Sequence, residues 1–177
     1  MQIKNNSTHF GLVAIILHWL IAILIIGMLA VGLYMVALPI GLQKLKLYGL
    51  HKAFGIIILG LVGLRIIWRL TNTTPSLALP KLELIAARLA HLGLYCLMLA
   101  MPISGWFMTS AAGLAPSFFG LFTLPNLVAP NEQLFQWFAF VHQWLAYGLI
   151  ALISIHTLAA LKHHFIDKDD ILRRMIS

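Results

Sequence analysis

The sequence predicts an all-α membrane protein, a bundle of four transmembrane helices, from three observations. Of its 177 residues, 61% are hydrophobic and only 10% are charged, and the mean hydropathy is +0.94. A soluble domain of this size cannot keep so much apolar surface away from water, so lipid must surround most of the chain. The apolar residues fall into long runs, and the length allows about four spans of roughly 20 residues, with short connections and no second domain.

The first two predicted helices cover residues 11–38 and 49–70. The first run is too long for a signal-peptide core, which is typically about 7–15 residues, and no convincing small-residue cleavage site follows it. Pro39 and Gly41 close this run, and a polar, proline-bounded loop at residues 71–80 follows the second run. Both runs are therefore expected to remain in the protein as membrane spans.

The third and fourth predicted helices cover residues 84–110 and 138–164. Pro102 is tolerated inside the third helix, because neighbouring helices satisfy the backbone groups that a proline leaves free. The one long connection, residues 111–137, is apolar and aromatic and has turn residues every few positions. We expect it to lie along the membrane surface as an interfacial lid.

The placement of the basic residues predicts the orientation of the bundle. The net charge is +7, but the charges gather at the ends of apolar runs, which is typical of membrane proteins and argues against nucleic acid as a partner. With the N-terminus inside, nine basic residues lie on the cytoplasmic side and three on the other, so both termini are predicted to be cytoplasmic. The cytoplasmic set is Lys4, Arg65, Arg69, Lys81, Arg88, Lys162, Lys168, Arg173 and Arg174, and the opposite set is Lys44, Lys46 and Lys52.

The chain holds eight histidines, which is unusual for so apolar a sequence. An imidazole at membrane depth costs free energy unless it is paired, so an intramembrane histidine is a functional candidate. The alternative for each is a structural role, as a hydrogen-bond partner of a neighbouring helix or as a helix cap. Five histidines lie in or at the ends of the apolar runs, namely His18, His51, His91, His142 and His156. The remaining three, His9, His163 and His164, lie outside the apolar core and are interpreted as interfacial.

The spacing of the intramembrane histidines favours a cofactor role. His142 and His156 are 14 residues apart, so on a helix they share a face and lie about 21 Å apart along its axis. His18 is expected at the depth of His156, and His51 at the depth of His142. Two facing pairs at two depths fit two six-coordinate haems, each held by two histidines. The pair His18 and His156 would hold the inner haem iron, and the pair His51 and His142 the outer one.

Other polar residues fall beside these positions. Arg65 and Arg69 lie near the helical face of His51, and arginine suits a haem propionate, although ordinary membrane anchoring is the alternative. His91 is a third candidate at the inner depth, interpreted as a hydrogen-bond partner of a propionate or quinone rather than as a ligand. Lys52, together with the other two outer lysines, forms a basic patch that either steers an anionic electron donor towards the outer haem or anchors the interface.

Several of these residues lie in motifs that resemble the bacterial cytochrome b561 family. The motifs are His18-Trp19, His51-Lys52 with Gly55, Arg65-x-x-Trp68-Arg69, His91-Leu92-Gly93-Leu94-Tyr95, Pro102 with Gly105-Trp106, and the ending from Leu161 to Met175. The resemblance covers nearly the whole chain, although the connection before the fourth helix is more apolar than in family members.

The resemblance implies a four-helix cytochrome of the bacterial inner membrane with two haem b groups, whose ligands match His18, His51, His142 and His156. It also implies oxidoreductase activity through electron exchange with the quinone pool, with ubiquinone as a substrate. Oxidation of superoxide, with ubiquinone as the electron acceptor, has been assigned within the family.

Two other interpretations remain open from the sequence. The chain could be a haem-bearing anchor subunit that passes electrons for a larger dehydrogenase or hydrogenase complex, although the lack of a sizeable extramembrane loop argues against docking of a protein partner. Alternatively, the histidines could bind transition metals in a transporter. The predicted helices carry no intramembrane carboxylate, and metal transporters usually need carboxylates or thiols beside the imidazoles.

Overall fold

The computed structural model describes residues 2–76 and 79–176, and this part of the chain is nearly all helical. Its long helices are α1 (Leu12–Ala37), α2 (Leu42–Thr71), α3 (Lys81–Ala111) and α4 (Glu132–Lys162). A π-helical turn (His163–Asp167) continues α4, and a short 3-10 helix (Arg173–Met175) follows. Within the described residues, four helices are long and apolar enough to cross a membrane. The predicted all-α membrane fold is confirmed.

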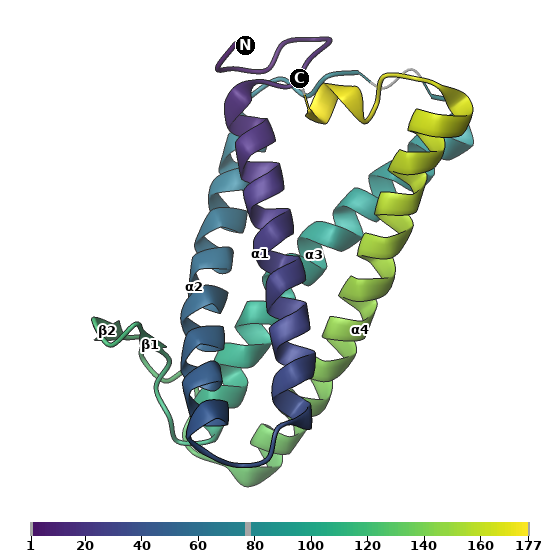
Figure 1. The fold of residues 1–177 in the computed structure, drawn as a ribbon. Coiled ribbons are helices and arrows are strands. Elements are labelled where there is room, and N and C mark those ends of the chain that lie inside the picture. Colours follow the sequence, from purple (N-terminus) through teal and green to yellow (C-terminus); the bar gives the residue numbers. More distant parts are fainter. Residues whose placement is uncertain (1, 77–78, 177) are drawn as a thin grey trace.

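The four helices pack in sequence order, with α1 against α2, α2 against α3 and α3 against α4. Figure 1 shows both termini and the α2–α3 connection at one end of the bundle, called here the terminal end. The α1–α2 and α3–α4 connections lie at the opposite end, called here the loop end. Large apolar side chains cover the outward faces of the helices, as expected where lipid is the solvent.

Three helices begin earlier than the apolar runs indicate, and α3 does so by three residues, at Lys81 rather than at residue 84. α2 begins at Leu42 rather than at residue 49, because its first turns carry polar residues that hydropathy does not mark as helix. α4 begins at Glu132 rather than at residue 138. Asn131 caps α4, since its side chain accepts a hydrogen bond of 2.9 Å from the Leu134 amide, and Glu132 adds a negative charge to the first turn. His51 and His142 therefore lie well inside their helices.

The connection between α3 and α4 contains a small β-hairpin beside the loop end of α2 (Figure 1). Strands β1 (Ser117–Phe118) and β2 (Phe122–Thr123) pair antiparallel. Phe119 and Gly120 in its turn have φ angles of 50° and 78°, which a tight hairpin turn requires. The Phe119 ring meets the ring of Phe54 on α2 edge to face, with centroids 5.5 Å apart. This contact helps to hold a bulky residue in a left-handed conformation that it rarely adopts.

A small apolar core lies halfway along the bundle. It comprises Ile21, Ile25, Ile58, Val62 and Leu149. On α4, Leu149 is seven residues from His142 on one side and seven from His156 on the other, which is about two helical turns in each direction. The core therefore separates the histidines of the loop end from those of the terminal end.

Hydrogen bonds at the terminal end join three segments that lie outside the four long helices. The Asn5 side-chain amide donates to the Thr73 carbonyl at 2.9 Å, and the Ser76 amide donates to the Ser7 carbonyl at 3.2 Å. The Arg174 guanidinium donates to the Ser76 carbonyl at 2.9 Å. The N-terminal segment, the α2–α3 connection and the C-terminal segment are thus tied to one another.

Acid is expected to loosen the C-terminal segment. The hydrogen bond and ion pair from Arg174, at 2.9 Å, lower the pKa of the Asp170 carboxyl group. Because the folded-state pKa lies below the unfolded value of about 3.9, the stabilisation is present above that value and is lost as pH falls through the folded pKa.

Hydrogen exchange, corrected for its intrinsic pH dependence, should show protection of the amides of residues 171–176 falling about twofold below pH 4, since an exposed pair contributes little. In Asp170→Asn this protection should already be lower at pH 7. Equal protection in both proteins at pH 7 would contradict a stabilising role of the Asp170–Arg174 ion pair.

Candidate functional site

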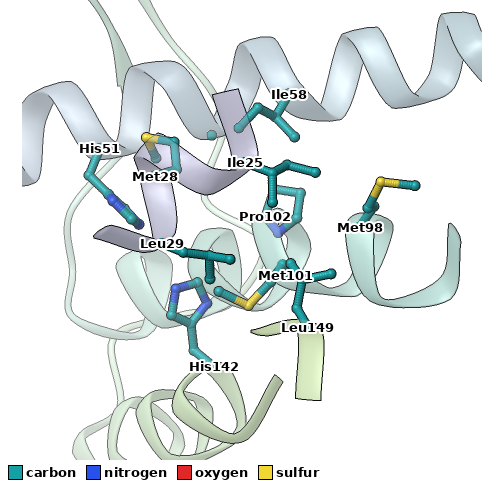
Figure 2. A pocket seen from close by; sticks show the side chains of 11 residues that line it. Ile25, Met28, Leu29, His51, Ile58, Met98, Met101, Pro102, His142 and Leu149 are labelled. Atoms are coloured by element: carbon teal, nitrogen blue, oxygen red, sulfur yellow. The ribbon is translucent and has the colours of Figure 1, made fainter. Parts of the chain in front are cut away.

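His51 of α2 and His142 of α4 face each other near the loop end. Their ring centroids are 6.3 Å apart and their planes are inclined by 74°. Figure 2 shows both imidazoles at the edge of one cavity, whose other labelled side chains are apolar, among them Met28, Ile58 and Met101. The polar atoms that reach this apolar space are therefore the ring nitrogens of the two histidines.

His18 of α1 and His156 of α4 form a second pair towards the terminal end. Their ring centroids are also 6.3 Å apart, with planes inclined by 67°. Two imidazoles that bind one metal ion from opposite sides, with nitrogens about 2 Å from the metal, have ring centroids about 6 Å apart. Both pairs have this separation, so each can hold one metal centre between its rings.

The terminal-end pair has a third histidine beside it. His91 of α3 lies with its ring centroid 5.6 Å from that of His156, closer than the 6.3 Å between His18 and His156. The rings of His18 and His91 thus both approach that of His156 at the terminal end.

The two arginines of α2 converge on Tyr95 of α3, one helical turn after His91. Arg65 Nε donates to the Tyr95 hydroxyl at 3.1 Å, and Arg65 Nη1 donates to the Ala14 carbonyl at 3.4 Å. The Arg69 guanidinium lies 5.6 Å from the centroid of the Tyr95 ring, a cation–π contact. The two guanidinium groups place positive charge beside the terminal-end histidines, where carboxylates of a cofactor would be stabilised.

Tyr95 was not among the predicted site residues. The signal that could have identified it is its four-residue spacing from His91, which puts both side chains on one face of α3.

The loop-end rings lie against glycines of neighbouring helices. A Cβ added at Gly32 of α1 would lie 3.4 Å from His51 Cε1, and one added at Gly105 of α3 would lie 3.2 Å from His142 Cε1. A Cβ at Gly105 would press on the imidazole of His142, whereas a Cβ at Gly32 would make van der Waals contact with that of His51. Opposed imidazoles, an apolar cavity and room behind both rings fit a flat apolar group that carries iron, such as haem.

The three lysines of the loop end differ in their surroundings. Lys44 donates to the Leu38 carbonyl at 2.7 Å and lies over the ring of Tyr48, so it closes the α1–α2 turn. Lys46 is exposed, and Lys52 is half-buried directly after His51. Of the three lysines in the predicted basic patch, Lys52 is therefore the one that is adjacent in sequence to a candidate ligand, His51.

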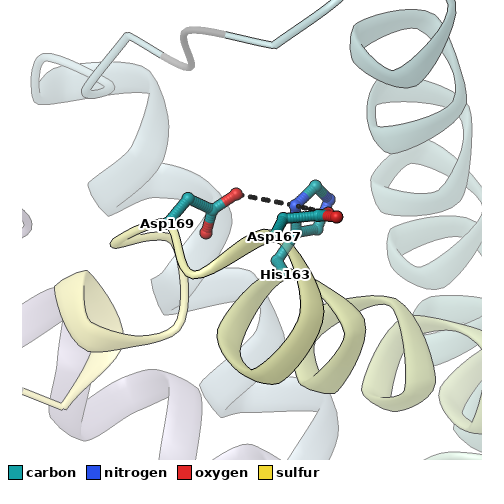
Figure 3. Close-up of side chains that lie close together, drawn as sticks. All are labelled: His163, Asp167 and Asp169. Atoms are coloured by element: carbon teal, nitrogen blue, oxygen red, sulfur yellow. Dashed lines mark hydrogen bonds and ion pairs between the residues drawn. The ribbon is translucent and has the colours of Figure 1, made fainter.

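A separate polar cluster ends α4 (Figure 3). His163 Nδ1 lies 2.7 Å from an Asp169 oxygen and 3.1 Å from an Asp167 oxygen. The Lys162 ammonium is 2.7 Å from Asp167 and 3.3 Å from Glu83 of α3. Because these carboxylates already have partners within the chain, and Lys162 bridges Asp167 to Glu83, we interpret the cluster as a structural contact that joins the end of α4 to the start of α3.

A four-span helical bundle with opposed histidines in its interior is the architecture of a b-type membrane cytochrome. The family model described as "Prokaryotic cytochrome b561" matches residues 9–177. The chain belongs to this family, which binds haem b and serves in electron transport.

Three relatives illustrate the similarity. "Cytochrome b561 homolog 2" of Escherichia coli (strain K12) is 38% identical over 181 residues, covering 99% of this chain and 95% of the relative. "Cytochrome b561 homolog 1" of the same organism is 34% identical and covers 71% of this chain and 72% of the relative. "Probable superoxide oxidase CybB" of Yersinia pestis is 35% identical, with 72% of this chain and 73% of the relative covered.

Proposed function

We propose that the chain is a di-haem b-type cytochrome of the bacterial inner membrane that transfers electrons from superoxide to ubiquinone. The observation that carries the proposal is the equal centroid separation of 6.3 Å in two histidine pairs on opposite sides of the apolar core. A relative named as a probable superoxide oxidase supports the choice of donor. A haem held by two histidines exchanges one electron at a time and has no open iron position for binding oxygen.

Each histidine pair has a distinct set of supporting residues. At the terminal end, proposed to face the cytoplasm, His18 and His156 would hold the inner haem, and Arg65 and Arg69 would neutralise its propionates. His91, beside His156, would donate or accept a hydrogen bond at a propionate or at ubiquinone.

At the loop end, His51 and His142 would hold the outer haem. The positive charge of Lys52, with the two lysines nearer the membrane surface, would attract the superoxide anion. The apolar core between the pairs keeps water out of the centre of the bundle, and the low polarity there favours the neutral imidazole form that metal binding requires.

The first test is the haem content of the detergent-purified protein, measured by pyridine haemochrome against protein mass. We expect about two b haems per chain, both low-spin in the oxidised and the reduced state. One haem per chain would overturn the proposal of two haem sites. No haem would overturn the proposal that the chain is a cytochrome.

The donor and acceptor are tested separately in liposomes that contain the purified protein and ubiquinone. We expect superoxide generated outside the liposomes to reduce ubiquinone at a rate that falls with ionic strength, because salt screens the attraction of the anion to the lysines. Haem reduction without ubiquinone reduction would be consistent with a cytochrome that accepts electrons from superoxide, but it would reject ubiquinone as the electron acceptor.

A further inference from the structure

Ser104 of α3 makes a hydrogen-bond chain with one of the loop-end histidines. This residue is 5% exposed. Its hydroxyl donates to the Met101 carbonyl at 2.8 Å, and its Oγ lies 2.8 Å from His142 Nδ1. The contact joins residues 38 positions apart in the sequence, on two neighbouring helices.

The donor and acceptor roles in this chain determine where the imidazole proton lies. A carbonyl oxygen can only accept, so the one proton of the Ser104 hydroxyl goes to Met101. The Ser104 oxygen must then accept from His142, which places the ring proton on Nδ1. Nε2 is left with its lone pair free, as a metal ligand needs.

Gly105, the next residue, provides the space for this arrangement. A Cβ there would lie 3.2 Å from His142 Cε1 and 3.6 Å from its Nδ1. The backbone of α3 therefore approaches one side of the ring while Ser104 binds its Nδ1, and together they fix the direction in which Nε2 points.

His142 differs in this respect from the other proposed ligands. His51 Nδ1 is buried and has no hydrogen-bond partner. Within residues 2–76 and 79–176, no hydrogen bond is found at the rings of His18 and His156 either. The loop-end pair is thus asymmetric, with one oriented imidazole and one without a partner.

We propose that Ser104 is a positioning residue that fixes the tautomer and orientation of His142 and thereby lowers the reduction potential of the outer haem. The inference rests on the proposed function, since it takes His142 as an iron ligand. A hydrogen bond accepted from Nδ1–H makes Nε2 a stronger electron donor. A stronger donor stabilises ferric iron relative to ferrous iron, which lowers the potential.

The test is Ser104→Ala in the haem-loaded protein, followed by a redox titration that resolves the two haems. We expect the reduced-to-oxidised ratio of the outer haem at a fixed ambient potential to rise about threefold, a shift of about 28 mV at about 59 mV per tenfold change. The inner haem should not change. The ferric electron paramagnetic resonance signal of the outer haem should also shift, because the ring is free to turn.

Two further variants separate the hydrogen bond from packing. Ser104→Thr keeps the hydroxyl and should restore the wild-type potential. Thr109→Val is the matched control, because Thr109 is equally buried on the same helix and donates to the Gly105 carbonyl at 2.8 Å without touching an imidazole. It should leave both potentials unchanged.

Each outcome decides the question. An unchanged outer potential in Ser104→Ala, or an equal rise in Thr109→Val, would overturn the role of Ser104 and leave the two-haem proposal intact. Loss of the outer haem in Ser104→Ala with retention in Ser104→Thr would support the role, whereas loss in both would overturn it. A wild-type protein with one haem would reject the proposed function itself.

Discussion

The His142→Ala variant is expected to bind one haem per chain, whereas we expect two in the wild-type protein. Removing this imidazole leaves His51 without an opposed partner at 6.3 Å. The inner pair lies beyond the apolar core, about 21 Å away along α4, and should stay loaded. The pyridine haemochrome assay against protein mass measures the loss, and a redox titration identifies the remaining haem as the inner one.

The control for this variant is His163→Ala, which removes a histidine just beyond the opposite end of α4 that pairs with carboxylates rather than with another imidazole. It should retain both haems. Two haems at full occupancy in His142→Ala would show that the loop-end pairing is wrong.

The second large change in haem content is expected at the terminal end, where three histidines are candidates for two ligand positions. His156→Ala should abolish the inner haem, because its ring is the one that both His18 and His91 approach. His91→Ala should keep two haems but change the absorption band and potential of the inner one, because a polar neighbour is lost.

Comparing haem content in the two variants separates the ligand from its neighbour. Loss of a haem in His91→Ala, with retention in His18→Ala, would move His91 into the ligand pair and His18 out of it. Equal loss in His91→Ala and His18→Ala would mean that the inner site depends on all three rings.

The helices and the histidine juxtapositions could be predicted because both depend on periodicity along single helices. A 14-residue spacing puts His142 and His156 on one face of α4 at two depths, and the structure brings His51 and His18 opposite to them. The helix starts could not be predicted from hydropathy, because the first turn of α4 depends on a capping hydrogen bond from Asn131.

Apart from the histidine pairs, contacts between helices could not be predicted from the sequence. Neither the Ser104–His142 contact nor the Arg65–Tyr95 hydrogen bond follows from the spacing of residues on one helix, since each depends on how two helices are rotated against each other. The hairpin of residues 117–123 was also missed. Its turn places Phe119 at a positive φ, where glycine or asparagine is the usual sequence signal.

The hydrogen bonds of the terminal end constrain the order in which the protein can be assembled. Ser76 is bonded to Ser7 on one side and to Arg174 on the other, so the first and last segments of the chain meet on the second connection. Chains are synthesised from the N-terminus, and Arg174 therefore arrives after all four spans have been made. The hydrogen bonds that tie the terminal end together can therefore be completed only after both loop-end connections have been synthesised.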